Sequence, residues 1–438
     1  MNPALSNELL SILHKEVTPA LGCTGPTALA YVAAEAAEAV GGTPKSVKIM
    51  VDRHMGTKNC DVGIPNSVYV GNEIAAALGA IAGDASAKLN VLHKVTPDDE
   101  AVAKQFVLDG HVQVVPDLET EVLGLFMDCT VETDKGIGRA VVVKTHTNLV
   151  HKEANGVVTV DIPYDRIASM NETHDAMASY VLADFYAFAT ERPLEDLLFL
   201  REAVEMNKKL ASTIFTGEAK GAGFAKSMMS RSEGNRIRKA KALVAAGAEA
   251  RMAGLSLPAM SCATSGNVGL TASLPLISLA EDLESSEEAL LRALAMSFLV
   301  TICVKNRIGR VSSMCACVTA ASEGIAAGTV MLLGGDLAQI DNAITTTIVN
   351  VFGVVCDGAR LACAMKLASA AGIAMECAEI AMDGYKTPAN EGVVGENADD
   401  SLNFMGSFAQ NGMKGSDLAL CKALYAKRQD QISKGKLF

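Results

Sequence analysis

Four of the eleven cysteines fall in two short groups, Cys315-Ala316-Cys317 and the stretch from Cys356 to Cys363. Soft thiolates grouped in this way suit an iron–sulfur cluster or, less well, zinc. The spacing differs from the CxxC pairs of zinc sites. Cysteine is also a small hydrophobic residue that packs well in cores. On spacing alone, a metal site and a structural role therefore stay equally open.

Two other segments carry side chains suited to a small polar ligand. Residues 22–27 form a short polar loop before an Ala-rich run, where Thr24 suits a helix N-cap and Pro26 a first-turn proline. A polar loop at a helix N-terminus is a natural anion site, although an ordinary helix cap would give the same sequence pattern. Residues 264–275 are rich in Gly, Ser, Thr and Asn, which can hydrogen-bond a carboxylate or an amine. The alternative there is a plain helix junction.

Other familiar chemistries find no support in the sequence. The seven histidines form no HExxH motif, and neither a GxSxG elbow nor a phosphate-binding GxxxxGK[ST] loop occurs. A pyridoxal phosphate Schiff base on Lys58 or Lys366 has no marking motif around it. Residues 252–280 contain no charge, but their Pro, Asn and Gly content is wrong for a lipid-facing helix. We expect this stretch to be a buried, polar-lined loop between helices.

The elements that must position these residues divide into two kinds. Helical spacing predicts two helices between residues 6 and 40, separated by a turn, and further helices over 73–82 and 98–109. Residues 54–66 read as a Gly-rich polar loop. Strand-like runs cover 46–52, 112–115, 125–132, 138–147 and 157–162. From about residue 167 onward nearly everything reads as helix. The expected fold class is α+β, a large, mostly α-helical catalytic domain (166–438) with a smaller antiparallel-sheet domain (43–165) and N-terminal helices (1–42) packing on the helical domain.

Composition narrows the class of protein further. Half of the 438 residues are hydrophobic, Trp is absent and aromatic residues make up only 4%, so Ala, Val, Leu, Ile and Met must fill the core. The net charge of −12 without a basic block argues against nucleic acid or an anionic membrane as partner. Eleven cysteines without a recognisable export signal favour a reducing cytoplasm. An apolar, Ala-rich helical surface is compatible with a homodimer.

Taken together, the motifs resemble a known family over essentially the whole chain. In order, they are Gly22-Cys23-Thr24 followed by Pro26, Met55 to Pro65 with Lys58-Asn59, Ser265 to Pro275, Cys315-Ala316-Cys317, and Cys356-Asp357-Gly358-Ala359 followed by Cys363. This pattern resembles the iron–sulfur L-cysteine desulfidases and the α-subunit-like iron–sulfur L-serine dehydratases. Gly25 stands where the family usually has an acidic residue, Arg360 where it has Lys, and Ala316 where it has Gly. The first departure lies beside the expected substrate loop and leaves the substrate open.

The resemblance implies a [4Fe–4S] cluster held by three cysteines, with one iron open to substrate and no pyridoxal phosphate. The expected ligands are Cys356, Cys363 and one of Cys315 and Cys317, of which we choose Cys315. Cys23 and Lys58 are the expected catalytic residues, with Cys23 as the base. The expected substrate-binding residues are Thr24, Asn59, Ser265, Asn267 and Thr271.

The implied reaction is β-elimination on a small L-amino acid. L-Cysteine would give pyruvate, ammonia and sulfide, and soft sulfur on iron slightly favours it over the alternative, L-serine. A non-enzymatic metal- or redox-sensing protein is the other class that uses grouped cysteines. Such a protein would need no substrate loop at Ser265–Pro275.

Overall fold

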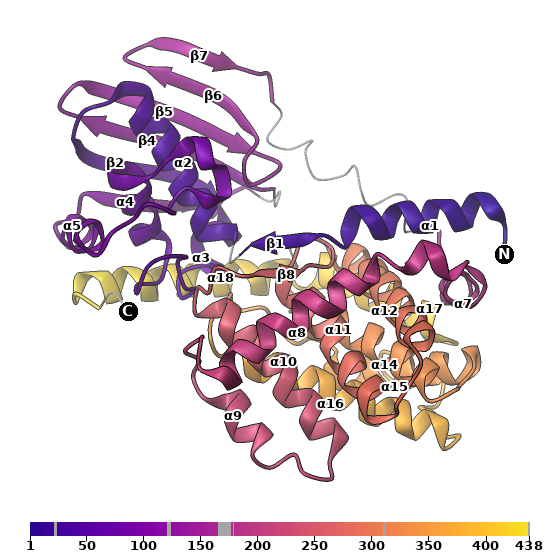
Figure 1. Cartoon of the computed structure of the whole chain (residues 1–438). Coiled ribbons are helices and arrows are strands. Elements are labelled where there is room, and N and C mark those ends of the chain that lie inside the picture. The colour runs from indigo at the N-terminus through magenta and orange to yellow at the C-terminus, as the bar shows by residue number, and fades with distance from the viewer. Residues whose placement is uncertain (22–23, 121–123, 165–176, 178, 310–311, 437–438) are drawn as a thin grey trace.

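The chain forms two bodies in a computed structural model, which describes residues 1–21, 24–120, 124–164, 177, 179–309 and 312–436. A six-stranded sheet with its covering helices makes the smaller body, and a helical assembly makes the larger (Figure 1). The α+β fold class is therefore confirmed. The three-part division of the chain at residues 42 and 165 stays a prediction.

The large sheet has the strand order β3-β2-β4-β5-β6-β7. Its strands are β2 (Pro44–Asp52), β3 (Val112–Asp117), β4 (Phe126–Thr133), β5 (Gly136–Val143), β6 (Leu149–Ala154) and β7 (Val157–Asp161). All neighbours are antiparallel except β2 and β3, which are parallel because several helices carry the chain across between them. The strand runs of the sequence analysis are confirmed, with one addition. Strand β6 was missed because its polar residues 151–153 break the apolar alternation.

The helices of the smaller body share one core with the inner face of this sheet. They are α2 (Thr24–Val40), α3 (Arg53–Lys58), α4 (Asn72–Ala82), α5 (Pro97–Leu108) and the short 3-10 helix η1 (Ala85–Asn90). The prediction that both N-terminal helices pack on the helical body is wrong for α2, whose Ala-rich face is buried against the sheet and α4. Residues 53–58 also form a helix, where a loop was expected, because the Asp52 carboxylate caps them.

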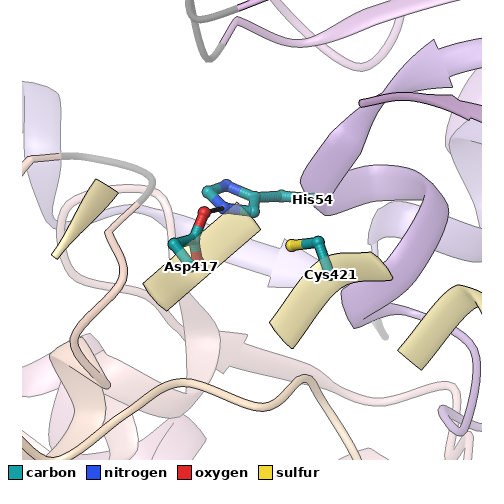
Figure 2. A group of neighbouring side chains, drawn as sticks. All are labelled: His54, Asp417 and Cys421. Atoms are coloured by element: carbon teal, nitrogen blue, oxygen red, sulfur yellow. Dashed lines mark hydrogen bonds and ion pairs between the residues drawn. The ribbon is translucent and has the colours of Figure 1, made fainter. Parts of the chain in front are cut away.

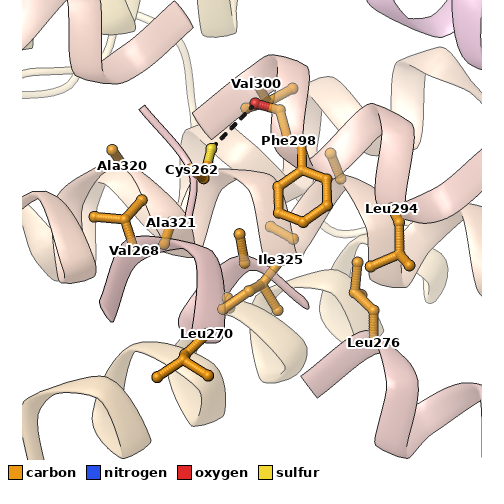
Figure 3. Close-up of a cluster of buried hydrophobic side chains, with 14 of the residues drawn as sticks. Cys262, Val268, Leu270, Leu276, Leu294, Phe298, Val300, Ala320, Ala321 and Ile325 are labelled. Atoms are coloured by element: carbon orange, nitrogen blue, oxygen red, sulfur yellow. Dashed lines mark hydrogen bonds between the residues drawn. The ribbon is translucent and has the colours of Figure 1, made fainter. Parts of the chain in front are cut away.

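The larger body is a helical assembly with an Ala- and Leu-rich core. Its helices are α1 (Pro3–Glu16), α7 (Leu182–Glu191), α8 (Leu200–Thr216), α9 (Phe224–Met229), α10 (Arg236–Met252), α11 (Gly266–Asp282), α12 (Glu287–Ile308), α13 (Ala316–Thr319), α14 (Ala321–Leu332), α15 (Leu337–Val351), α16 (Cys363–Met382), α17 (Ala398–Ser407) and α18 (Lys414–Ser433), with the 3-10 turn η3 (Leu194–Leu197) and the π-helical turn η4 (Phe408–Gly412). Figure 3 shows part of this core, in which Val268 and Leu270 of α11, Phe298 of α12 and Ile325 of α14 belong to one buried cluster.

The expectation of a loop over residues 252–280 is wrong for most of that stretch. Ser265 caps α11, which continues to Asp282 with Pro275 inside it. The polar side chains that suggested a loop are accommodated within the helix, where the Ser273 hydroxyl donates to the Gly269 carbonyl. Among the described residues, no helix combines the length and the apolar character needed to cross a membrane.

Two segments join the two bodies. Strand β1 (Pro19–Leu21) pairs with β8 (Pro258–Met260) in a two-stranded antiparallel sheet, which brings the start of α2 near the segment that precedes α11. Helix α18 leaves the helical body and runs beneath the smaller one (Figure 1). There its Arg428 forms a fully buried ion pair with Glu73 of α4, with Nη2 and Oε2 2.9 Å apart. The candidate site lies where these bodies meet.

Candidate active site

The three predicted cluster ligands converge although they come from separate segments. Cys315 precedes α13, Cys356 lies between α15 and α16, and Cys363 is the first residue of α16. The backbone around the first two pairs like a short antiparallel ladder. The Cys315 N–H donates to the Val354 carbonyl (2.8 Å), and the Cys356 N–H donates to the Ser313 carbonyl (2.9 Å). This pairing places the two side chains next to each other.

The thiols of this group interact directly. A hydrogen bond with Cys317, followed by burial, raises the pKa of the Cys315 thiol to about 12, and Cys356 is its second thiol partner. The hydrogen bond with Cys315, and then burial, raises the pKa of Cys356 well above its ordinary value. Burial is also the main cause that raises the pKa of Cys363. Four thiols packed so closely could not all ionise without a cation among them.

The donor set fits an iron–sulfur cluster. Several soft sulfur donors lie together in a largely apolar cluster of side chains that includes Val318, Val351 and Ala370. Cys317 is half-buried and packs on the same group, so Cys315 and Cys317 both stay candidates for the third ligand. These four cysteines include the three cluster ligands that the sequence analysis expected.

The segment 356–363, here called the cluster loop, docks on the end of α3. The Ala359 N–H donates to the Lys58 carbonyl (2.7 Å), and Asp61 pairs with Arg360 through a backbone bridge. Gly358 has φ +107°, and a Cβ there would lie 2.6 Å from the Lys58 carbonyl oxygen. Glycine is required at this position by both its backbone conformation and the close approach. The predicted catalytic lysine and the predicted ligands therefore form one site.

The side chain of Lys58 belongs to a buried ionic network that sequence reasoning missed. Its Nζ donates to Asp417 Oδ1 of α18 at 2.7 Å and lies 3.5 Å from the Ser312 carbonyl oxygen. The other oxygen of Asp417 lies 2.7 Å from His54 Nε2 (Figure 2). All three side chains are more than nine-tenths buried.

The protonation states follow from this arrangement. Burial opposes ionisation of Asp417, but the His54 hydrogen bond and the Lys58 ammonium outweigh it, so the pKa of that carboxyl is lowered. Burial lowers the pKa of His54, because it disfavours the charged imidazolium. His54 is therefore neutral and donates its Nε2–H to Asp417. His54 Nδ1 is then an acceptor, and it is buried without a partner in the described structure. Cys421 lies close enough for the thiol, His54 and Asp417 to hold one metal ion. We instead interpret Lys58 as the cation of this group, because it already pairs with Asp417.

The sequence contains only a weak indication of this network. His54 and Lys58 are four residues apart and share one face of α3, but this spacing has meaning only if the segment is a helix. Nothing in the sequence links Asp417 to residues more than 350 positions away.

The predicted substrate residues near the start of α2 are only partly described. Cys23 lies outside the described residues. Thr24 is half-buried, and its carbonyl accepts a hydrogen bond from Thr27. Gly25 lies directly against Asn59, since a Cβ on Gly25 would fall 2.8 Å from the Asn59 side chain. The loop before α2 and the Lys58-Asn59 pair are thus neighbours, as the sequence analysis required.

The three predicted substrate residues of the second polar segment differ in availability. Ser265 accepts the Val268 N–H as the N-cap of α11. Asn267 Oδ1 accepts from Arg251 Nη1 at 3.0 Å, while its Nδ2 faces the Met252 sulfur. Thr271 is fully buried and donates to the Asn267 carbonyl within the helix. Their substrate-binding roles stay predictions, and Asn267 has the most suggestive surroundings.

Comparison with known proteins identifies the family of the chain. A sequence profile described as serine dehydratase alpha chain matches residues 86–422. A UPF0597 protein of Photobacterium profundum is 36% identical over 433 residues, which cover 98% of this chain and 100% of that protein. A UPF0597 protein of Oleidesulfovibrio alaskensis is 35% identical over 430 residues, with 96% and 98% covered. One from Clostridium tetani is 34% identical over 416 residues, with 95% and 97% covered.

These similarities assign the chain to a class of amino-acid lyases. The chain belongs to the serine dehydratase alpha-chain family, as the resemblance in the sequence indicated. The names of the three relatives state no substrate.

Proposed function

We propose that the protein is an L-cysteine desulfidase that carries out a [4Fe–4S]-dependent β-elimination. The observation that carries the proposal is the docking of the cluster loop on Lys58, because it joins a group of soft donors to a buried ammonium in one site. Family membership adds the reaction class, elimination on a small amino acid. No pyridoxal phosphate is required by the proposal.

Cys356, Cys363 and Cys315 would hold the cluster. When bound, the cluster supplies a Lewis-acidic iron that makes the β-substituent of the substrate a better leaving group. Lys58 supplies a fixed positive charge beside it. Its pairing with Asp417 holds the ammonium in place, so that it can stabilise negative charge that develops during elimination.

The α-proton is removed by a base of the protein. Cys23 is the base inferred from the sequence, since a thiolate near a helix N-terminus can have a lowered pKa. The structure adds His54 Nδ1 as a second candidate, because this atom is unprotonated and has no described partner. Thr24, Asn59 and Asn267 are the residues proposed to bind the amino and carboxylate groups.

The reaction balances without a redox partner. Removal of the α-proton and loss of the thiol from L-cysteine give sulfide and 2-aminoacrylate. Tautomerisation of this enamine and addition of water to the resulting imine give pyruvate and ammonia. L-Serine would react in the same way with water as the leaving group, and the description of the matched family favours this second candidate.

Two further features of the proposal concern the protein as a whole. All cysteines that the structure describes are free thiols, which suits a reducing compartment such as the cytoplasm. A homodimer is proposed from the apolar, Ala-rich helical composition.

The test is anaerobic purification, with assays for iron, acid-labile sulfide and pyruvate from each amino acid. The proposal predicts about four irons per chain and sulfide release from L-cysteine. Pyruvate from L-serine alone would assign the protein to the dehydratases. A preparation reconstituted with iron and sulfide that forms no pyruvate from either would contradict both candidates.

A further inference from the structure

Arg251, at the end of α10, carries a buried guanidinium for which the described residues provide no counter-ion. Arg251 is only 6% exposed. Nη1 donates to the neutral amide of Asn267, and Nε has no partner among the described residues. Within the described parts of the chain it forms no ion pair, in contrast to the buried cations Lys58 and Arg428, which each pair with a carboxylate.

Such a placement is unfavourable in the free protein. A cation removed from water is costly unless an anion or a full set of hydrogen bonds replaces the lost hydration. A guanidinium also remains charged at any ordinary pH, so Arg251 cannot escape the cost by losing its proton. Its planar group of donors matches a carboxylate, which can accept two parallel hydrogen bonds.

The surroundings of Arg251 keep it close to the proposed active site. Gly266 leaves the necessary space, since a Cβ there would lie 2.5 Å from Arg251 Nε. The next residue, Met252, packs in one small cluster with Val62 and Ala359. Ala359 is the residue of the cluster loop whose N–H binds the Lys58 carbonyl. Arg251 is thereby tied to both Asn267 and the cluster loop.

We propose that Arg251, oriented by Asn267, binds the α-carboxylate of the substrate. This inference rests on the proposed function and assigns the residue that recognises the acid end of the amino acid. It makes the carboxylate a main source of affinity, so amines and amides of the same size should bind more weakly than the corresponding acids.

The test compares two small thiols that differ in the group recognised. Under anaerobic conditions, calorimetry measures binding of 3-mercaptopropionate, which keeps the carboxylate and lacks the amine, and of cysteamine, which keeps the amine and lacks the carboxylate. The variants are Arg251→Gln and Arg251→Lys in the cluster-loaded protein. Arg238→Gln is the matched control, because Arg238 lies on the same helix and is exposed.

The expected result is selective. Arg251→Gln weakens binding of 3-mercaptopropionate about 10- to 100-fold, the usual range for a lost hydrogen bond to a charged group, and leaves cysteamine unchanged. The affinity of Arg251→Lys for 3-mercaptopropionate falls between those of the wild type and Arg251→Gln, since this variant keeps the charge and loses the planar donors. Arg238→Gln behaves like the wild type toward both thiols. An equal loss for both thiols, or no loss for either, would overturn the inference.

The calorimetric readout separates this inference from the proposed reaction. If the wild type releases no pyruvate but binds 3-mercaptopropionate through Arg251, the proposed function fails and the carboxylate site stands. If the wild type eliminates sulfide while Arg251→Gln binds both thiols normally, the reaction stands and the inference fails. Absence of 3-mercaptopropionate binding to the wild type also overturns the inference. If Arg251→Gln does not fold, the Arg251→Lys comparison decides, because it retains the buried charge.

Discussion

Replacing Asp417 by Asn removes the only charge that neutralises Lys58 in the described structure. Asn is the same size, and its side-chain oxygen can still accept the Nε2–H of His54, so the packing of α18 against α3 is preserved. What is lost is the carboxylate 2.7 Å from the Lys58 ammonium. The amide NH2 that replaces this oxygen is a donor and cannot accept from the ammonium, so the substitution removes both the charge and the hydrogen bond of the pair.

The expected cost is large because both partners are buried. The side chains of Lys58 and Asp417 are 8% and 2% exposed, so water cannot solvate the ammonium left behind. Breaking a buried pair in this way typically costs about 3–5 kcal/mol of unfolding free energy. Because the pKa of Asp417 is lowered in the folded protein, the wild type loses this contribution progressively as the pH falls below about 3.9. The deficit of the variant should therefore shrink at low pH.

Urea unfolding of the wild type and Asp417→Asn at about pH 7 and about pH 3 measures both effects. Asp430→Asn is the control, because it makes the same change on the same helix at an exposed ion pair with Lys434. That change should cost no more than about 1 kcal/mol. If Asp417→Asn destabilises the protein no more than Asp430→Asn does, or if its deficit grows as the pH falls, the ionic account of the network is refuted.

Three more predictions concern the cluster loop and His54. Gly358→Ala should lower the iron content after reconstitution, since its Cβ meets a backbone carbonyl, whereas Gly353→Ala, also at positive φ but with open space around it, should retain iron; equal iron contents would contradict the docking argument. Cys315→Ser should lose iron and Cys317→Ser should retain most of it, and the reverse result would reassign the third ligand. Because burial lowers the pKa of His54, the unfolded state takes up a proton first as the pH falls below about 6.5, so stability declines there. Thermal unfolding between about pH 5 and pH 7 should show a shallower decline for His54→Gln, and parallel curves would count against a buried neutral imidazole.

The sequence predicted the parts of the fold that local patterns specify. Strand β2 alternates clearly, β5 contains an apolar Val-rich run, and α4 and α5 have helical periodicity with recognisable ends, so all four were found. Strand β6 and helix α3 were missed because their signals are weak. In α3 the Asp52 carboxylate accepts from the N–H groups of His54 and Met55, and this cap had been read as part of a loop.

The site was predictable only where residue types carry the chemistry. Grouped cysteines have few explanations, so their convergence could be expected from type and order. Arg251 and Asp417 have many possible roles in a sequence, and an Arg at a helix end usually faces solvent. Their significance comes from burial and from what lies opposite them, which are properties of the tertiary structure. The structure was therefore needed to recognise Arg251, as a buried cation without a described partner, and Asp417, as the partner of Lys58.

The balance of charge across the site connects these residues. Lys58 and Asp417 neutralise each other, so this pair can fix a local dipole without drawing in another ion. Arg251 has no such partner in the described structure. The residue after it, Met252, packs against Ala359 of the cluster loop. A zwitterionic amino acid would place its carboxylate on the unmatched cation and leave its β-substituent free to reach the cysteine-lined side. A site that already balanced every charge would gain little from binding the carboxylate, because a strong ion pair would have to be broken first. The unpaired guanidinium therefore favours an acid-bearing substrate over a neutral one of similar size.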